Sequence, residues 1–198
     1  MNETNIIIAT EQELSSEEFP YTLSLRRKEI DNEKELHKFI ASCERMMRNS
    51  PEYKMWTGYV RDVLGHRACS ITGEKLGELS IDIHHHPYSL YIIIKGLILK
   101  CVEEENDFCS FDIITKCIEF HYENKIPYVP IVKSLHEKFH NGFLAIPISL
   151  CHGDIDYFMK YYSFLLEDEE QETILKRLKI TTDNCGWEIG YKWVNSDG

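Results

Sequence analysis

The sequence predicts an α+β fold in which a small β-sheet is surrounded by helices. Residues 79–83 alternate apolar and polar side chains, which is typical of a half-buried strand. Longer segments such as the one containing Leu36, Phe39, Ile40 and Cys43 place apolar residues on one face of a helix. With 198 residues, 43% of them apolar, the chain is long enough for one domain with a substantial core.

The first part of the chain is expected to contain helices and a hairpin. Asparagine, serine and proline at 49–51 favour a helix boundary, and Gly65 favours the end of a second helix. The predicted elements are a short strand at 6–8, a helix from an Asp31 cap to about Arg48, a helix at 53–64, and a hairpin of strands 69–73 and 79–83.

The rest of the chain is predicted to be mainly helical. Two prolines at 127 and 130 favour an extended segment, and Asn141-Gly142 favours a helix end. The predicted elements are helices at 88–104 and 108–124, an extended segment at 126–130, a helix at 132–140, an extended piece at 146–148, helices at 154–166 and up to about 179, and a strand at 186–193.

These elements suggest three segments. Residues 1–52 form an N-terminal helical and extended flank, residues 53–142 form the core with a helical insertion at 88–125, and residues 143–198 form a C-terminal helical flank. Without the insertion, the central order is strand, strand, helix.

Composition limits the classes of function. The net charge of −11 argues against a protein that binds nucleic acid through bulk charge, although a local basic patch could still reach phosphates. The seven cysteines are scattered without a C-x-x-C pair, which indicates reduced thiols in the cytoplasm. The longest apolar stretch, residues 90–99, is too short to span a bilayer, so we expect no membrane association.

Histidines are the most informative candidates for chemistry. His84, His85 and His86 are consecutive at the end of the predicted strand, and His136 and His140 lie four residues apart on one helical face. Neutral imidazole is a common ligand of zinc and similar divalent ions. A strand end and a facing helix can therefore converge on one divalent metal ion, and a histidine that is not a ligand could act as a general base.

The histidine motifs resemble those of the HNH (His-Me finger) endonucleases. The resemblance rests on Arg61-Asp62, on residues 69–73, on Ile83 to Pro87, and on Leu135 to His140, so it covers roughly residues 56–142. In that family a ββα-metal core holds one divalent cation between a hairpin and a helix. Val129, Pro130 and Ile131 occupy the region where the family has an asparagine that orients the base.

The resemblance implies a role for each matching residue. It makes His84 and His140 metal ligands, His136 a further candidate ligand, and His85 the general base that activates water. The register within 84–86 stays open by one residue. The basic residues near the motif, which are candidates for holding phosphates, are Arg61, Arg67 and Lys138.

Two functions therefore follow as expectations. The first is a metal-dependent DNA endonuclease that uses one Zn, Mg, Mn or Ni ion, in the cytoplasm of a bacterial host and of phage or mobile-element origin. The second is an inactive HNH-like metal-binding module whose acidic surface binds a protein partner.

Overall fold

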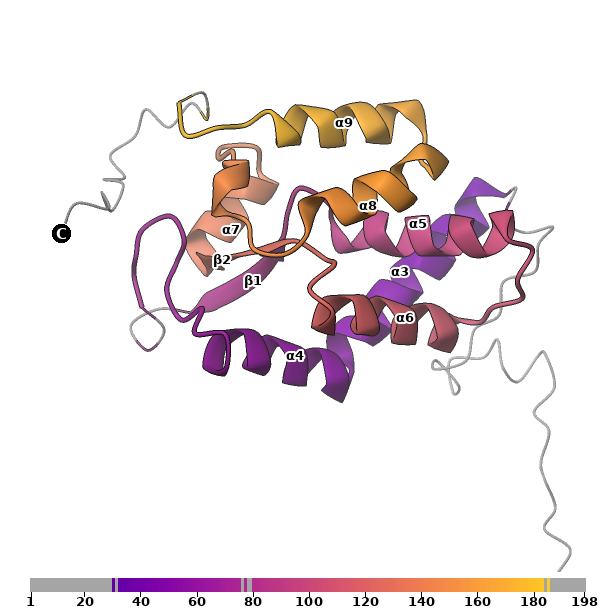
Figure 1. Cartoon of the computed structure of the whole chain (residues 1–198), viewed down its shortest axis with the longest axis horizontal. Helices are drawn as coiled ribbons and strands as arrows, with labels where there is room; N and C mark the ends of the chain where they lie inside the picture. Colours follow the sequence, from indigo (N-terminus) through magenta and orange to yellow (C-terminus); the bar gives the residue numbers. More distant parts are fainter. Residues whose placement is uncertain (1–29, 31, 76, 78–79, 184, 186–198) are drawn as a thin grey trace, which may run out of the picture.

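In the residues that the structure describes, two antiparallel strands form a small sheet and the other regular elements are helices (Figure 1). The structure, a computed structural model, describes residues 30, 32–75, 77, 80–183 and 185. The α+β class predicted from the sequence is confirmed. The elements in chain order are α3 (Glu33–Asn49), α4 (Pro51–Asp62), β1 (Ile81–His85), α5 (Leu90–Glu103), α6 (Ser110–Tyr122), β2 (Tyr128–Val132), α7 (Lys133–His140), η1 (Ile148–Leu150), α8 (Ile155–Tyr161), η2 (Ser163–Leu165) and α9 (Asp168–Leu178).

Side-chain caps fix the starts of several helices. The side chains of Asn32, Ser50 and Ser89 accept hydrogen bonds from backbone N–H groups in the first turns of α3, α4 and α5. The predicted cap at Asp31 was therefore one residue too early. Asp154 caps α8 in the same way, with two backbone N–H groups donating to its carboxylate.

The larger core lies among helices α3, α4, α5 and α6, which pack against one another. It includes Phe39, Trp56 and Phe158, which come from the described parts of all three segments proposed above. A smaller core joins the sheet to α7 through Val129, Ile131, Leu135 and their neighbours. The division into three segments stays a prediction.

The strand pairing differs from the predicted hairpin. Strand β1 pairs with β2, in the register Ile81↔Val132 to His85↔Tyr128, and not with residues 69–73. The strand also begins and ends later than expected, so His84 and His85 lie within it and not after it. In the 69–77 region, the described pairing is a single bridge between Ala68 and Lys75. The alternation of apolar and polar residues predicted the strand correctly, but such alternation does not indicate which other strand it pairs with.

The C-terminal part also departs from the expected elements. The predicted helix at 154–166 is divided at Tyr162 into α8 and the 3₁₀ helix η2. The segment predicted as extended at 146–148 leads directly into η1. The strands expected at 6–8 and 186–193 lie outside the described residues.

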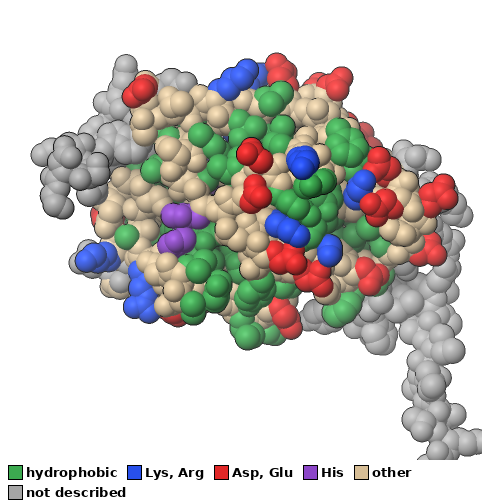
Figure 2. Space-filling view, in the orientation of Figure 1, with side chains coloured by type: hydrophobic (Ala, Val, Ile, Leu, Met, Phe, Trp, Pro, Cys, Tyr) green, Lys and Arg blue, Asp and Glu red, His purple; other side chains and the backbone are tan. Residues whose placement is uncertain are grey.

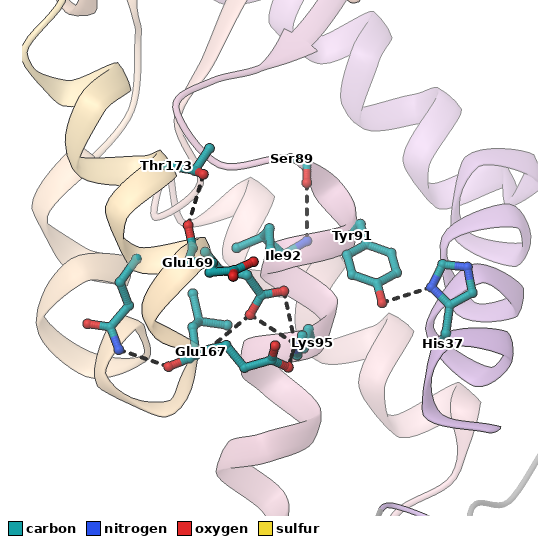
Figure 3. A network of polar contacts seen from close by, with 11 residues as sticks. His37, Ser89, Tyr91, Ile92, Lys95, Glu167, Glu169 and Thr173 are labelled. Carbon is teal, nitrogen blue, oxygen red and sulfur yellow. Dashed lines mark hydrogen bonds and ion pairs between the residues drawn. The ribbon is translucent and has the colours of Figure 1, made fainter. Parts of the chain in front are cut away.

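A buried lysine attaches α9 to α5 (Figure 3). Lys95 Nζ donates to Glu167 Oε1 at 2.7 Å and to both carboxylate oxygens of Glu170 at 2.9 Å. The Lys95 side chain is only 8% exposed, so its charge needs these partners. In the same view, the Tyr91 hydroxyl hydrogen-bonds to His37 of α3, which links α3 to α5 at 3.0 Å.

Charged side chains are distributed unevenly over the surface. Figure 2 shows acidic and basic side chains mixed over one end, and exposed histidine side chains bordered mainly by apolar and uncharged atoms. In the part of the chain that the structure describes, no helix is both long and apolar enough to cross a membrane.

Candidate metal centre

Strand β1 sends consecutive histidines to opposite faces of the sheet. Side chains alternate along a strand, so Asp82 and His84 lie on the face covered by α7, whereas His85 lies on the face covered by α4 and α6. The cross-strand partners show the same division, since His84 is opposite Val129 of the smaller core and His85 is opposite Tyr128 of the larger core.

Three histidines converge between β1 and α7. We name this the triple-histidine cluster, consisting of His84, His136 and His140. One nitrogen from each ring lies within 4.8 Å of the other two, and within the described residues it is the one group of three or more such side chains that could hold a metal ion. The spacing of four residues on α7 places His136 and His140 on one helical face, with their Nε2 atoms 2.9 Å apart.

Asp82 orients one of these rings. Its carboxylate oxygen lies 3.0 Å from His136 Nδ1 and can only accept, so Nδ1 donates the hydrogen bond. The lone pair of a neutral His136 is then on Nε2, which faces His140. A carboxylate that holds the far nitrogen of a histidine is the usual support of a metal-binding imidazole.

His84 is the buried member of the cluster. Its Nε2 atom is buried and has no hydrogen-bond partner among the described residues, which is energetically unfavourable for a polar atom. Burial, and next the proximity of His136, lower the pKa of His84 to about 2, so the ring is neutral near neutral pH. His140 is the exposed member, and burial followed by His136 lowers its pKa as well.

These observations test whether the residues fit a metal ion. Two tetrahedral nitrogen ligands at 2.0–2.1 Å from zinc lie about 3.3 Å apart, close to the observed separation of the His136 and His140 nitrogens. One ring nitrogen of His84 lies within 4.8 Å of the other two and offers a third donor, and the exposed His140 leaves the cluster open to solvent on one side. The donor set therefore fits a divalent transition metal ion.

The structure places His85 elsewhere. It is buried between α4 and α6, its ring stacks with that of Trp56 at 6.2 Å, and its Nε2 lies 2.8 Å from His121 Nε2. His121 Nδ1 donates to the Cys117 carbonyl at 2.6 Å, so the neutral His121 accepts at Nε2 and His85 donates. We name His85 and His121 the buried histidine pair. It is separate from the triple-histidine cluster.

His86 lies beside the cluster without joining it. Its ring is fully buried and packs against Phe139, whose ring also contacts His84. Burial, and next the charge of Arg177, lower the pKa of His86 to about 4. Arg177 of α9 lies over the Phe139 ring and donates to the Pro87 carbonyl at 2.9 Å, which attaches α9 to this side of the molecule.

The three basic residues expected to hold phosphates are spread over two regions. Arg61 donates to the Thr57 carbonyl within α4, and Arg67 forms an exposed ion pair with Asp62 at 2.6 Å. Arg61 lies on α4 and Arg67 lies in the segment after it. Helix α4 packs on α3 and α6, whereas the cluster lies between β1 and α7. Lys138 is exposed on α7, the helix that carries two members of the cluster.

Sequence reasoning missed Asp82 and His121. Asp82 could have been found, because it precedes His84 by two residues and therefore shares its face of the strand. His121 could not, since it lies 36 residues from His85 and nothing in its spacing indicates their contact.

Comparison with known protein families places the chain beside a phage virion family. The family model described as Bacteriophage G278-like virion protein matches residues 3–191, which include every residue of the cluster and of the buried pair. No curated protein and no solved structure matches the chain.

Proposed function

The chain belongs to the Bacteriophage G278-like virion protein family, and from this premise we propose that it is a metal-binding virion protein. The metal ion would be held by His84, His136 and His140. The observation that carries the proposal is the convergence of three imidazoles, one of which belongs to the buried His84, whose Nε2 has no hydrogen-bond partner among the described residues. Membership in a phage virion family agrees with the expected phage or mobile-element origin.

The donor set narrows the choice of metal. Zinc, copper and nickel bind imidazole well, whereas magnesium prefers oxygen ligands and keeps several waters. The cluster offers three nitrogens, and its nearest carboxylate, Asp82, is occupied by His136. We therefore propose zinc or nickel rather than magnesium for this site.

A bound ion would connect the sheet to a short helix. Helix α7 has eight residues and one fully buried side chain, Leu135, so its packing area is small. Coordination by one ligand from β1 and two from α7 would add a link between these elements. In such a module, the acidic surface of the chain would meet a protein partner within the virion.

Zinc titration of the purified protein tests this proposal. We expect one tight site by competition with a chromophoric chelator, and we expect the double variant His136→Ala/His140→Ala to lose it. The matched control is His37→Ala, because His37 is an exposed helical histidine that contacts Tyr91 and does not belong to the cluster. Equal zinc affinity of the wild type and the double variant would refute the proposal.

A second candidate function is metal-dependent hydrolysis of phosphodiester bonds in DNA. The order β1–β2–α7, with His84 on a strand and His140 on the helix, supports it because it parallels the ββα-metal arrangement of the HNH resemblance. A metal ion bound at the cluster would supply Lewis-acid chemistry. The position of His85 counts against its proposed role as base, because its Nε2 is engaged by His121 on the opposite face of the sheet.

Plasmid nicking separates the two candidates. If the protein is a nuclease, it nicks DNA in the presence of zinc, nickel, manganese or magnesium ions, and His140→Ala abolishes nicking. If it is a non-catalytic module, it binds zinc without nicking under any of these conditions. The variant His85→Phe then asks whether any activity depends on His85 as a base, and its unfolding midpoint shows whether the fold is retained.

A further inference from the structure

A pocket lies on the opposite side of the sheet from the triple-histidine cluster. It has a volume of about 400 Å³ and lies among the ends of α4 and α6, the start of β2 and the segment before α8. All but three of its lining residues carry an aromatic or imidazole ring. We name this the aromatic pocket, lined by Trp56, Tyr59, Leu64, His66, His121, Tyr122, Asn124, Tyr128, His152 and Gly153.

The backbone fixes one wall of the pocket. His152 and Tyr128 exchange two backbone hydrogen bonds of 2.8 and 2.9 Å. Gly153 has φ of +96°, and a Cβ atom there would lie 2.7 Å from the Ile126 carbonyl oxygen. Glycine therefore allows the segment to lie against the backbone at 126–127, which holds the His152 ring beside the sheet.

Two imidazole rings are stacked in this wall. The rings of His66 and His152 have centroids 3.9 Å apart and planes 29° apart. The Tyr128 hydroxyl hydrogen-bonds to His66 Nδ1 at 3.1 Å, which leaves His66 Nε2 without a described partner. Burial lowers the pKa of both histidines, so both rings are neutral near neutral pH.

The pocket has polar edges but no charged lining side chain. Neither ring nitrogen of His152 and neither side-chain atom of Asn124 has a hydrogen-bond partner among the described residues. The lining contains no aspartate, glutamate, lysine or arginine, although the chain as a whole carries a net charge of −11. A charged ligand would lose hydration there without meeting an opposite charge, so an uncharged ligand is favoured.

The rings and the polar edges together select a class of ligand. Aromatic faces bind planar rings by stacking. Tyr59 and Tyr122 line the pocket, are 36% and 44% exposed, and have ring centroids 5.9 Å apart. A plain hydrocarbon ring would leave the imidazole and carboxamide groups unpaired. A planar heterocycle with hydrogen-bonding edges would satisfy both the rings and the polar groups, and nucleobases have this chemistry.

We propose that the aromatic pocket binds an uncharged nucleobase, with its ring stacked on the tyrosines and its edge held by His66, Asn124 and His152. This site shares no residue with the triple-histidine cluster. Its occupation does not require a metal ion. The recognised part is the base, because no lining side chain can neutralise a phosphate.

Calorimetric titration with free nucleosides tests the proposal. We expect saturable binding of at least one of adenosine, guanosine, cytidine and thymidine. The corresponding 5′-monophosphate should bind no more tightly, and the affinity should change little between about 50 and 200 mM salt, in contrast to binding driven by phosphate contacts. Indole, a ring without the polar edge of a base, should bind more weakly.

Three variants locate the binding. His66→Phe and His152→Phe keep a ring but remove its nitrogens, and each should weaken the nucleoside by about threefold to tenfold, the range expected for one hydrogen bond. Asn124→Gly removes the carboxamide at a φ of +58°, which glycine adopts without strain. His37→Phe is the control outside the pocket and should bind like the wild type.

Unfolding midpoints verify that each variant is folded before its affinity is compared. The proposal is overturned if no nucleoside binds saturably up to about 10 mM, a limit of roughly −3 kcal/mol. It is also overturned if indole binds as tightly as the nucleosides, or if the three pocket variants and His37→Phe bind alike.

Discussion

The two faces of the small sheet place adjacent histidines in opposite environments. On the α7 face, His84 meets two other imidazoles, and within the part of the chain that the structure describes its Nε2 has no hydrogen-bond partner. On the other face, His85 is packed against Trp56 and shares a hydrogen bond with His121. Burial lowers the pKa of both His84 and His85. Burial and a lowered pKa are therefore common to both rings, and the two histidines differ in their neighbours: two other imidazoles beside His84, and a single hydrogen-bonded imidazole beside His85.

The two regions also differ in how they contribute to the fold. The buried histidine pair lies in the larger core, where His121 also accepts a hydrogen bond from Trp56 Nε1 at its backbone carbonyl. The triple-histidine cluster lies at the edge of the smaller core, and His140 is exposed. Substitutions in the first region should therefore change stability, and substitutions in the second should change metal binding.

The largest expected effect is the loss of metal affinity in His140→Ala. Removing a direct ligand should weaken zinc binding by more than the roughly 10–100-fold that the loss of an outer-shell partner costs. The stability of the metal-free protein should stay within about 0.5 kcal/mol of the wild type, because the side chain is exposed. Chelator competition measures the affinity and urea unfolding measures the stability. If His140→Ala binds zinc as tightly as the wild type, His140 is not a metal ligand.

The converse effect is expected for His121→Leu. This change removes the hydrogen-bond partner of His85 and leaves a buried donor unpaired, so we expect destabilisation of about 2–4 kcal/mol. Zinc affinity should stay within a factor of about three of the wild type, because the pair is on the other face. Urea unfolding in the presence of a chelator gives the stability. A large loss of zinc affinity in a folded variant would show that the two regions are coupled.

A smaller effect on metal binding is expected for Asp82→Asn. The amide retains the size of the carboxylate but supports His136 Nδ1–H less strongly, so zinc affinity should fall by about 10–100-fold. Asp62→Asn is the matched control, since Asp62 pairs with Arg67 on the surface. Both variants are compared with the wild type by the same chelator competition. Equal affinity of all three proteins would mean that Asp82 does not support a metal ligand.

The mildest effect is the acid sensitivity that His121 contributes. Burial lowers its folded-state pKa to about 4, below the 6.5 of an exposed histidine, so the unfolded chain binds the proton first as pH falls. Its stabilisation is complete above about pH 6.5 and is lost as the pH falls towards 4. Urea unfolding with chelator at several pH values across this window measures the decline. His121→Leu should show a shallower decline than the wild type, and an equal decline would contradict the assignment.

The sequence predicted the components of the site better than their arrangement. Spacing alone brought His136 and His140 to one helical face. Alternation predicted a strand that ends just before His84, whereas β1 includes His84. The partner of that strand, β2, lies after a long helical insertion, and strand alternation contains no information about partners so distant. The separation of His84 from His85 follows from the same alternation, once the strand is known to include both residues.

Two groupings of side chains from distant parts of the chain could not be predicted from the sequence. The contact of His85 with His121 depends on the packing of α6 against α4. No pattern of neighbouring residues in the sequence indicates how these two helices pack. The aromatic pocket gathers His66, Asn124 and His152 from three separate loops, and none of them has an informative spacing in the chain.

Anomalous diffraction at the zinc absorption edge, from crystals grown with equimolar zinc, tests the central claim most directly. We expect one strong peak between β1 and α7, with the nitrogens of His84, His136 and His140 at about 2.0–2.1 Å from it. His85 should remain hydrogen-bonded to His121 in the same crystals. A peak bound by His85, or by His66 and His152 instead of the cluster, would contradict the account, as would the absence of any peak.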